Sequence, residues 1–273
     1  MIVSYLMGGA ANQIFQYAAG LALSRRFGVE FRINDSRFLE DREWRMYSLG
    51  LFKGITEQID RRTVGQTIQE PGLRYNPGLL PWNPGDYTLL GYFQCEKYFA
   101  ELKDELKQRF VPKDALPEFH RGMESLILLQ EARSVFVTIR RTDYVNNAFH
   151  GVLPMSYYRE AADLIASKVL DPWFFVFSDD PEWCAANFNL PYKWVLAGNF
   201  DRTVKPHLGR EDAELWLMRR CRHAIMANSS YSWWGTWLGR ADEGGIVVAP
   251  KQWFGLNANE YSGDICPERW IKL

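Results

Sequence analysis

Residues 2–33 read IVSYLMGGAANQIFQYAAGLALSRRFGVEFRI, and this stretch decides the fold. The apolar run Ile2–Leu6 predicts a strand, which the following glycine pair ends. The pattern Asn12–Phe27 predicts a helix that Gly28 stops as a C-cap, and Val29–Ile33 predicts a second strand. A strand, a helix and a strand in so short a span are typical of α/β architecture with parallel strands.

The same alternation continues along the rest of the chain, with a break near its middle. Residues 111–117 are polar and contain prolines, which favours a domain boundary there. We therefore expect an α/β fold of two Rossmann-like domains facing a cleft, residues 1–115 and 116–273, with ligands beyond the carboxyl ends of the strands. The other predicted elements are strands at 134–139, 173–177, 224–227 and 245–249, helices at 95–110, 156–168, 212–221 and 231–238, and a loop over 74–87.

Composition narrows the class of partner. The chain has 273 residues, of which 32 are basic and 33 acidic, and its formal net charge is -1. This balance gives no electrostatic case for a nucleic-acid partner. No apolar run reaches the ~18 residues of a membrane span, so no integral membrane segment is expected. The four scattered cysteines predict reduced, buried thiols in a cytoplasmic protein, and a peripheral association with the inner membrane is left open.

The first candidate binding element joins the first strand to the first helix and reads Gly8-Gly9-Ala10-Ala11-Asn12-Gln13. Glycines let a backbone approach a ligand, and a helix N-terminus offers N–H groups to anionic oxygen. The alternative is a tight structural turn in which Asn12 caps the helix.

Two adjacent arginines, Arg140 and Arg141, leave the predicted strand 134–139. A guanidinium can clamp a diphosphate through paired hydrogen bonds, and Asp143 can orient an arginine or accept a proton. The alternative is an ordinary surface ion pair. The position at the carboxyl end of a strand favours function, because that is where ligands bind in parallel sheets.

Polar residues also follow the next two predicted strands of the second domain. Asp179 and Asp180 precede Pro181, where a carboxylate can recognise a nucleobase or cap a helix. After strand 224–227, hydroxyls at a helix start suit either phosphate binding or capping, and Trp233 and Trp234 suit an ordinary core. The polar residues of this second group are Asn228, Ser229, Ser230 and Ser232.

Motifs for metal-assisted and hydrolytic chemistry are absent from the sequence. There is no Asp-x-Asp pair, no Walker loop, no GxSxG and no HExxH, and none of the four histidines has metal-ligand spacing. We therefore expect neither a metal nor a cofactor. Any leaving diphosphate would be stabilised by arginine side chains and helix dipoles.

Taken in order, these motifs resemble those of glycosyltransferase family 11, the α-1,2-fucosyltransferases, in its bacterial form. The family pattern Gly-Gly-x-Gly-Asn-Gln-x-Phe-x-Tyr-Ala matches residues 8–18, with Ala11 in place of a glycine. The signature His-x-Arg-Arg-x-Asp-Tyr matches residues 138–144, with Thr138 in place of the histidine. Further family elements match residues 91–99, 177–180, 228–235 and 249–254.

The resemblance implies a GT-B-like fold in which the first domain is the acceptor side, with a donor-contacting first loop, and the second binds the nucleotide sugar. It implies a metal-independent, inverting transferase that moves L-fucose from GDP-β-L-fucose to a glycan with terminal galactose, in an α-1,2 linkage. By the same resemblance, Arg140 is the main diphosphate ligand with Arg141 in support. Asp143 holds their loop or acts as base, and His150 is the second candidate for the base.

The resemblance also implies a set of donor-binding residues. Asn12 contacts the donor near its fucosyl unit, and either Asp179 or Asp180 reads the guanine. Ser230 and Ser232 contact phosphate, and the set is completed by Gln13, Asn228 and Ser229.

Two other functions stay open because of the departures at Thr138 and Ala11. One is a transferase with the same phosphate machinery but another GDP-sugar or another linkage. The other is a carbohydrate-binding protein that has lost catalysis. Retention of the charged residues at 140, 141 and 143 favours an active enzyme.

Overall fold

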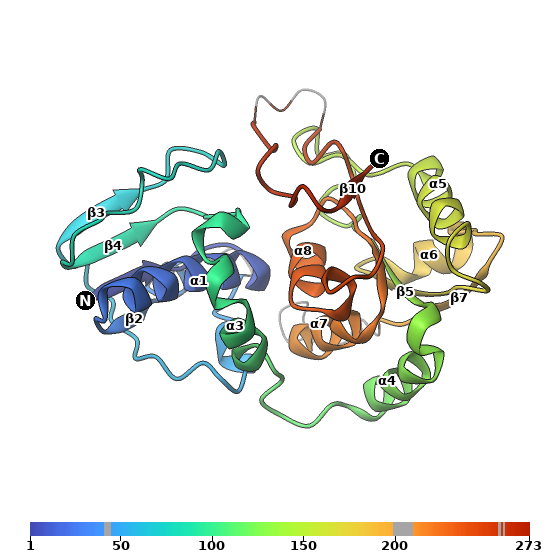
Figure 1. Ribbon diagram of the computed structural model, residues 1–273, viewed down its shortest axis with the longest axis horizontal. Helices are drawn as coiled ribbons and strands as arrows, with labels where there is room; N and C mark the ends of the chain where they lie inside the picture. Colours follow the sequence, from blue (N-terminus) through green and yellow to red (C-terminus); the bar gives the residue numbers. More distant parts are fainter. Residues whose placement is uncertain (41–44, 199–209, 256–257, 259) are drawn as a thin grey trace. The chain divides into compact units, whose positions relative to one another are not determined.

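The computed structural model describes residues 1–40, 45–198, 210–255, 258 and 260–273. The chain forms two compact units, shown in Figure 1. The first comprises residues 1–114 and 260–267, and the second comprises residues 115–259 and 268–273. Residues 260–267, which the sequence analysis placed in the second domain, therefore pack within the first unit.

The first unit is a four-stranded parallel sheet with helix α1 packed on it (Figure 1). The strand order is β2-β1-β4-β3, so β1 and β4 are the central pair. Because all the pairings are parallel, the carboxyl ends of β1 and β4 lie at the same edge of the sheet. The elements of this unit are β1 (Ile2–Tyr5), α1 (Ala10–Phe27), β2 (Phe31–Asn34), α2 (Arg37–Glu40), β3 (Gln66–Gln69), β4 (Tyr87–Leu90), α3 (Lys103–Arg109) and 3₁₀ turns at Leu49–Leu51, Glu96–Tyr98 and Ala100–Leu102.

The predicted strand–helix–strand unit at the N-terminus is confirmed, but its helix begins earlier than expected. The N-cap of α1 is Gly9, so Asn12 lies inside the first turn and does not cap the helix. Gly8 has a φ of 75°, and a Cβ there would lie 2.7 Å from Nδ2 of Asn12. Glycine is therefore required at this position, both for the backbone conformation and for the close approach of Asn12. Gly28 ends the helix in the left-handed conformation, as predicted.

The prediction of one helix over 95–110 is wrong. The segment forms two 3₁₀ turns and then the short helix α3, Lys103–Arg109. Phe99, between the two turns, has a φ of -152°, which is incompatible with a helix. The fully buried Phe99 ring packs edge-on against Phe15 of α1 at 5.9 Å, so tertiary packing has overridden the helical periodicity.

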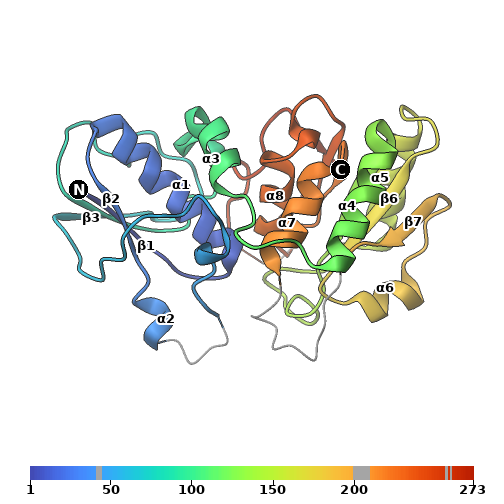
Figure 2. The ribbon, with the colours of Figure 1, turned by 90° about the horizontal axis from the view of Figure 1, so that it is seen from below.

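The second unit is a six-stranded parallel sheet with helices on both faces (Figure 2). The strand order is β10-β9-β8-β5-β6-β7. Strands β6 and β7 lie on one side of β5, and β8, β9 and β10, which come later in the chain, lie on its other side. The carboxyl ends of β5 and β8 therefore form a topological switch point, the place where open α/β sheets bind ligands. The strands are β5 (Ser134–Ile139), β6 (Trp173–Ser178), β7 (Lys193–Leu196), β8 (His223–Ile225), β9 (Val247–Ala249) and β10 (Ile271–Lys272), and the helices are α4 (Glu118–Gln130), α5 (Met155–Ala166), α6 (Pro181–Asn187), α7 (Glu211–Arg220) and α8 (Ser230–Trp237), with 3₁₀ turns at Glu131–Arg133 and Arg240–Asp242.

Side chains of β5 point alternately to the two faces of the sheet, and both faces are buried. Val135, Val137 and Ile139 belong to a buried cluster that includes residues of α5 and α6. Because successive strand residues point to opposite faces, Phe136 and Thr138 face the side covered by α8. Trp233 and Trp234 of α8 are fully buried, which confirms that they are core residues. The prediction of two Rossmann-like α/β units with parallel sheets is thus confirmed.

All four cysteines are free thiols and buried, as expected. No helix in the described part of the chain is long and apolar enough to cross a membrane.

A pair of glycine substitutions tests the packing of α1. At Gly20 an added Cβ would lie 2.1 Å from Oγ of Ser4 and 2.5 Å from the ring of Phe31, so Gly20→Ala should destabilise the fold by about 1–3 kcal/mol. Gly122 in α4 has no atom within 4 Å of such a Cβ, so Gly122→Ala should stabilise the protein by about 0.5–1 kcal/mol. Urea unfolding of both variants checks this, and equal effects would contradict the packing described here.

Candidate functional site

The site of the second unit is centred on Arg140, directly after β5. Its Nη2 lies 2.7 Å from Oδ1 of Asp143, and its Nε lies 3.2 Å from Oδ2 of Asp179. Its guanidinium also lies 5.4 Å from the ring centroid of Tyr144. Burial lowers the pKa of Arg140, but the carboxylates of Asp179 and Asp143 more than offset this, and the net shift is upward. A permanently charged, oriented guanidinium therefore stands at the switch point of the sheet.

Asp179 holds the turn that follows β5. Its carboxylate accepts hydrogen bonds from the backbone N–H of Arg141 at 2.8 Å and of Thr142 at 3.2 Å, and from the hydroxyl of Thr142. Together with the ion pair to Arg140, these contacts use both of its oxygens. Asp179 therefore stabilises the turn at Arg141 and Thr142 that follows β5.

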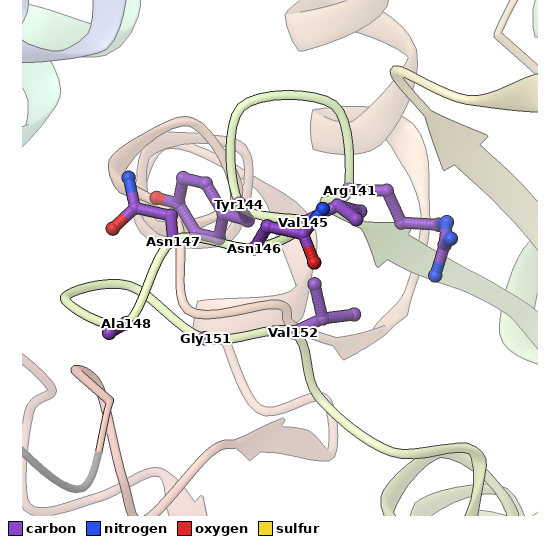
Figure 3. A pocket seen from close by; sticks show the side chains of 8 residues that line it. All are labelled: Arg141, Tyr144, Val145, Asn146, Asn147, Ala148, Gly151 and Val152. Atoms are coloured by element: carbon purple, nitrogen blue, oxygen red, sulfur yellow. The ribbon is translucent and has the colours of Figure 1, made fainter.

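Arg141 and Asp180 belong to the same site but point toward α6. The guanidinium of Arg141 stacks on Trp183 at 3.7 Å from the ring centroid, and its Nε lies 3.4 Å from Oδ2 of Asp180. The other oxygen of Asp180 accepts from the backbone N–H of Trp183 and caps α6, so the capping interpretation of Asp180 is confirmed. Figure 3 shows the Arg141 side chain extending away from the Tyr144 ring.

The segment after Arg141 borders a pocket of about 490 Å³ (Figure 3). Tyr144 lies over this pocket, and its ring stacks on His150 with centroids 4.3 Å apart and planes 5° apart. The hydroxyl of Tyr144 donates to the backbone oxygen of Asn228. The same Tyr144 ring lies beside the guanidinium of Arg140. The pocket is lined by Arg141, Tyr144, Val145, Asn146, Asn147, Ala148, Gly151 and Val152.

The side chain of Asn228 holds the segment at His150 and Gly151 through hydrogen bonds. Its amide nitrogen donates to the carbonyl oxygens of His150 at 3.0 Å, Gly151 at 3.2 Å and Trp253 at 2.9 Å. Only 3% of Asn228 is exposed, and its contact with Trp253 is buried, while those with His150 and Gly151 are partly buried. These contacts show that Asn228 holds the segment in place, and donor contact by Asn228 stays a prediction.

The three serines of this region have different environments. Ser229 caps α8 by accepting from the N–H of Tyr231, so the capping interpretation is confirmed for this residue. Ser230 is partly exposed at the start of the helix. Ser232 is buried, and its hydroxyl pairs with that of Thr138 at 2.7 Å, while Thr138 also accepts from the N–H of Ala227. Of the three, Ser230 is the one whose position suits contact with a phosphate.

Asn12 and Gln13 lie in the first unit, near the carboxyl end of β1. Gln13 is fully buried and ties the glycine turn to a later segment, donating to the oxygens of Gly8 and Met46 and accepting from the N–H of Ser48. Asn12 is partly exposed and accepts from the side-chain amide of Gln94 at 2.9 Å. Gln13 therefore supports the glycine turn, and its contact with the donor stays a prediction.

Sequence reasoning missed the aromatic partners of the two arginines. Trp183 and Tyr144 orient Arg141 and Arg140, but Trp183 lies far along the chain and carries no local signal. Tyr144 stood inside the quoted signature, and its stacking on His150 depends on the fold. Among the residues that the structure describes, no group of three or more His, Cys, Asp or Glu side chains is placed to hold a metal ion.

Comparison with known proteins identifies the family of this chain. The family model of Glycosyl transferase family 11 matches residues 80–273. Alpha-1,2-colitosyltransferase of Escherichia coli is 32% identical, with 100% of this chain and 99% of that protein covered. The O-antigen biosynthesis glycosyltransferase WbnK of Escherichia coli is 28% identical, with 99% of each chain covered. Galactoside alpha-(1,2)-fucosyltransferase 1 of Saimiri sciureus is 25% identical, with 87% of this chain and 65% of that protein covered. On these matches, the chain belongs to glycosyltransferase family 11.

Proposed function

We propose that the protein transfers L-fucose from GDP-β-L-fucose to a hydroxyl of a glycan with terminal galactose, with inversion, without a metal and in an α-1,2 linkage. The observation that carries the proposal is the oriented Arg140 guanidinium at the switch point between β5 and β8. Membership of a glycosyltransferase family and the likeness to an alpha-(1,2)-fucosyltransferase support the choice of reaction.

The charge and geometry of Arg140 suit a diphosphate leaving group. Its contacts with Asp143 and Asp179 use Nη2 and Nε, and among the described residues Nη1 has no hydrogen-bond partner. The two carboxylates hold the planar fork in one orientation, so little entropy is lost when a phosphate oxygen binds. The start of α8, at Ser230, offers backbone N–H groups and a favourable dipole to the same ligand.

The proposed reaction is a single displacement. The acceptor oxygen bonds to the anomeric carbon while the bond from that carbon to the diphosphate breaks, and GDP leaves with both electrons of that bond. Arg140 neutralises the charge that grows on the diphosphate, an effect usually worth more in a water-excluded site than in solvent. The hydroxyl proton passes to a base, for which Asp143 is the first candidate and His150 the second.

A second candidate donor follows from the relative of 32% identity, which is named as a colitosyltransferase. Colitose is fucose without its 3-hydroxyl. A site that hydrogen-bonds this hydroxyl discriminates by about 10⁴–10⁵-fold against the sugar that lacks it, whereas an apolar site accepts both. A site that hydrogen-bonds the 3-hydroxyl therefore gives a large preference for GDP-fucose, whereas an apolar site gives little preference between the two donors.

We expect GDP-fucose to be used with a higher kcat/KM than GDP-colitose, with lactose as the acceptor. The measurement is initial-rate GDP release with each donor, followed by linkage determination of the product by NMR. A preference for GDP-colitose would assign the protein to the second candidate. A product linked elsewhere than at the 2-hydroxyl of galactose would contradict the α-1,2 assignment.

A further inference from the structure

In the first unit, one carboxylate holds the turn that follows β4. Oε2 of Glu70 accepts hydrogen bonds from the backbone N–H groups of Tyr92 and Phe93, each at 2.8 Å. Its other oxygen is buried and has no hydrogen-bond partner in the described part of the chain. A Cβ at Gly91 would lie 2.4 Å from the Cβ of Glu70 and 2.9 Å from Oε2, so glycine permits this approach. The carboxylate is built tightly into the turn.

The turn that Glu70 holds is strained. Phe93 has a φ of 52°, the left-handed conformation that bulky residues rarely adopt. Its ring is fully buried and packs edge-on against Tyr98 at 5.5 Å, so the surroundings determine the conformation. Strained backbone of this kind persists only where the structure enforces it, and it concentrates at functional sites.

The strained residue directs its neighbour toward the first helix. Gln94 follows Phe93, and its amide nitrogen donates to Oδ1 of Asn12 at 2.9 Å. Asn12 comes from the turn after β1, which pairs in parallel with β4. The two amides thus meet beyond the carboxyl ends of the central strands, the edge at which such sheets bind ligands. Tyr92, in the same turn, is 37% exposed.

We propose that Glu70 is a positioning residue which, through the turn at Tyr92 and Phe93, fixes Gln94 and Asn12 as a preorganised amide pair that binds the hydroxyls of a pyranose ring. Their mutual bond uses Oδ1 of Asn12 and Nε2 of Gln94, and among the described residues Nδ2 of Asn12 and Oε1 of Gln94 have no partner. One donor and one acceptor match a sugar hydroxyl, which both donates and accepts.

This inference rests on the proposed function, which supplies two pyranose rings, the sugar of the donor and the galactose of the acceptor. Because the contacts of Glu70 are made by an accepting oxygen, glutamine can replace it and alanine cannot. Burial raises the pKa of Glu70 and the two N–H bonds lower it, with a net upward shift, but Oε2 accepts in either protonation state. Glu70→Ala and Glu70→Gln are therefore the informative pair.

The experiment measures the acceptor KM, kcat, the slow acceptor-free release of GDP, and the Kd for GDP. Glu70→Ala should reduce kcat/KM for the acceptor by about 10–10²-fold, because the amide pair loses its fixed position. Glu70→Gln should restore near wild-type constants, and the affinity for GDP alone should not change. Glu101→Ala, the same substitution at an exposed residue of the same unit, is the matched control and should have no effect.

The rate of GDP release without acceptor shows which of the two pyranose rings binds to the amide pair. An unchanged rate in Glu70→Ala places the acceptor ring on the amide pair, and a rate reduced by the same factor as transfer places the donor sugar there. Equal losses in Glu70→Gln and Glu70→Ala, a parallel loss of GDP affinity, or unchanged kinetics in folded Glu70→Ala would each overturn the inference.

A second variant keeps the inference testable if Glu70→Ala does not fold. Gln94→Ala removes one amide without disturbing the buried carboxylate and should give the same kinetic signature. If the wild-type protein transfers no sugar at all, the proposed function fails. The amide pair is then tested by saturation-transfer NMR with lactose and GDP-fucose, in which binding of a ring to the wild type but not to Gln94→Ala supports it and equal signals from both proteins overturn it.

Discussion

Replacing Arg140 with alanine is expected to lower kcat for sugar transfer by about 10²–10³-fold, the usual cost of losing one preorganised group that stabilises a developing charge. The guanidinium is held by Asp143 at 2.7 Å and by Asp179 at 3.2 Å, so its orientation is set before substrate binds. Arg140→Lys should also be poor, because an ammonium group cannot pair with two carboxylates and a phosphate in one plane. Steady-state kinetics with a saturating donor measure both effects.

The matched control for Arg140 is Arg133→Ala in the same unit. Arg133 pairs with Asp171 at 2.8 Å, with 43% and 48% of the two side chains exposed, so the pair is in contact with solvent and contributes little. Its removal should leave kcat unchanged. A folded Arg140→Ala protein with near-normal turnover would remove the central element of the proposed mechanism.

Asn228→Ala is expected to destabilise the protein by about 2–4 kcal/mol, because it leaves one buried and two partly buried carbonyl groups without this donor. The amide nitrogen serves the carbonyls of His150, Gly151 and Trp253, and only 3% of Asn228 is exposed. Transfer should fall as well, since the anchored segment carries Tyr144 beside Arg140. Thermal and urea unfolding, with kinetics well below the unfolding temperature, measure the two effects separately.

Asn228→Asp separates hydrogen bonding from side-chain volume. It keeps the shape of asparagine but replaces the N–H donors with a carboxylate oxygen that faces carbonyl oxygens, so it should be at least as destabilising as alanine. Asn187→Ala is the matched control, because its amide donates one exposed hydrogen bond to the carbonyl of Trp183 and its loss should change stability by less than about 0.5 kcal/mol. An aspartate variant as stable as the wild type would contradict the anchoring role.

The parts of the fold that the sequence predicts are those in which local pattern and burial agree. Strand β5 has six buried residues, four of them apolar, and a pair of arginines follows its carboxyl end. Strand β3, Gln66–Gln69, was not predicted because its residues are mostly polar and exposed, and pairing with β4 makes it a strand. The prediction of a helix over 95–110 was wrong although the helical periodicity is present in the sequence. There the packing of Phe99 against Phe15 outweighs the local pattern.

The candidate site shows the same division. The motifs identified Arg140, Asp143, Asp179 and Asn228 as a group, because each follows a strand of one parallel sheet. The motifs do not separate residues that can contact a ligand from residues that hold the site in shape. That distinction depends on contacts between distant segments, such as Asn228 with the carbonyl of Trp253 and Asp179 with the N–H of Arg141.

The central claim is metal-free transfer from a GDP-sugar, and the most direct test is the release of GDP from GDP-fucose in the presence of EDTA, with and without lactose. The account predicts release that lactose stimulates and EDTA does not inhibit, together with a fucosylated lactose product. Release that requires a divalent ion would contradict the role given to Arg140. Tight GDP binding without any release would contradict the assigned donor or acceptor, and no binding of GDP would contradict the account as a whole.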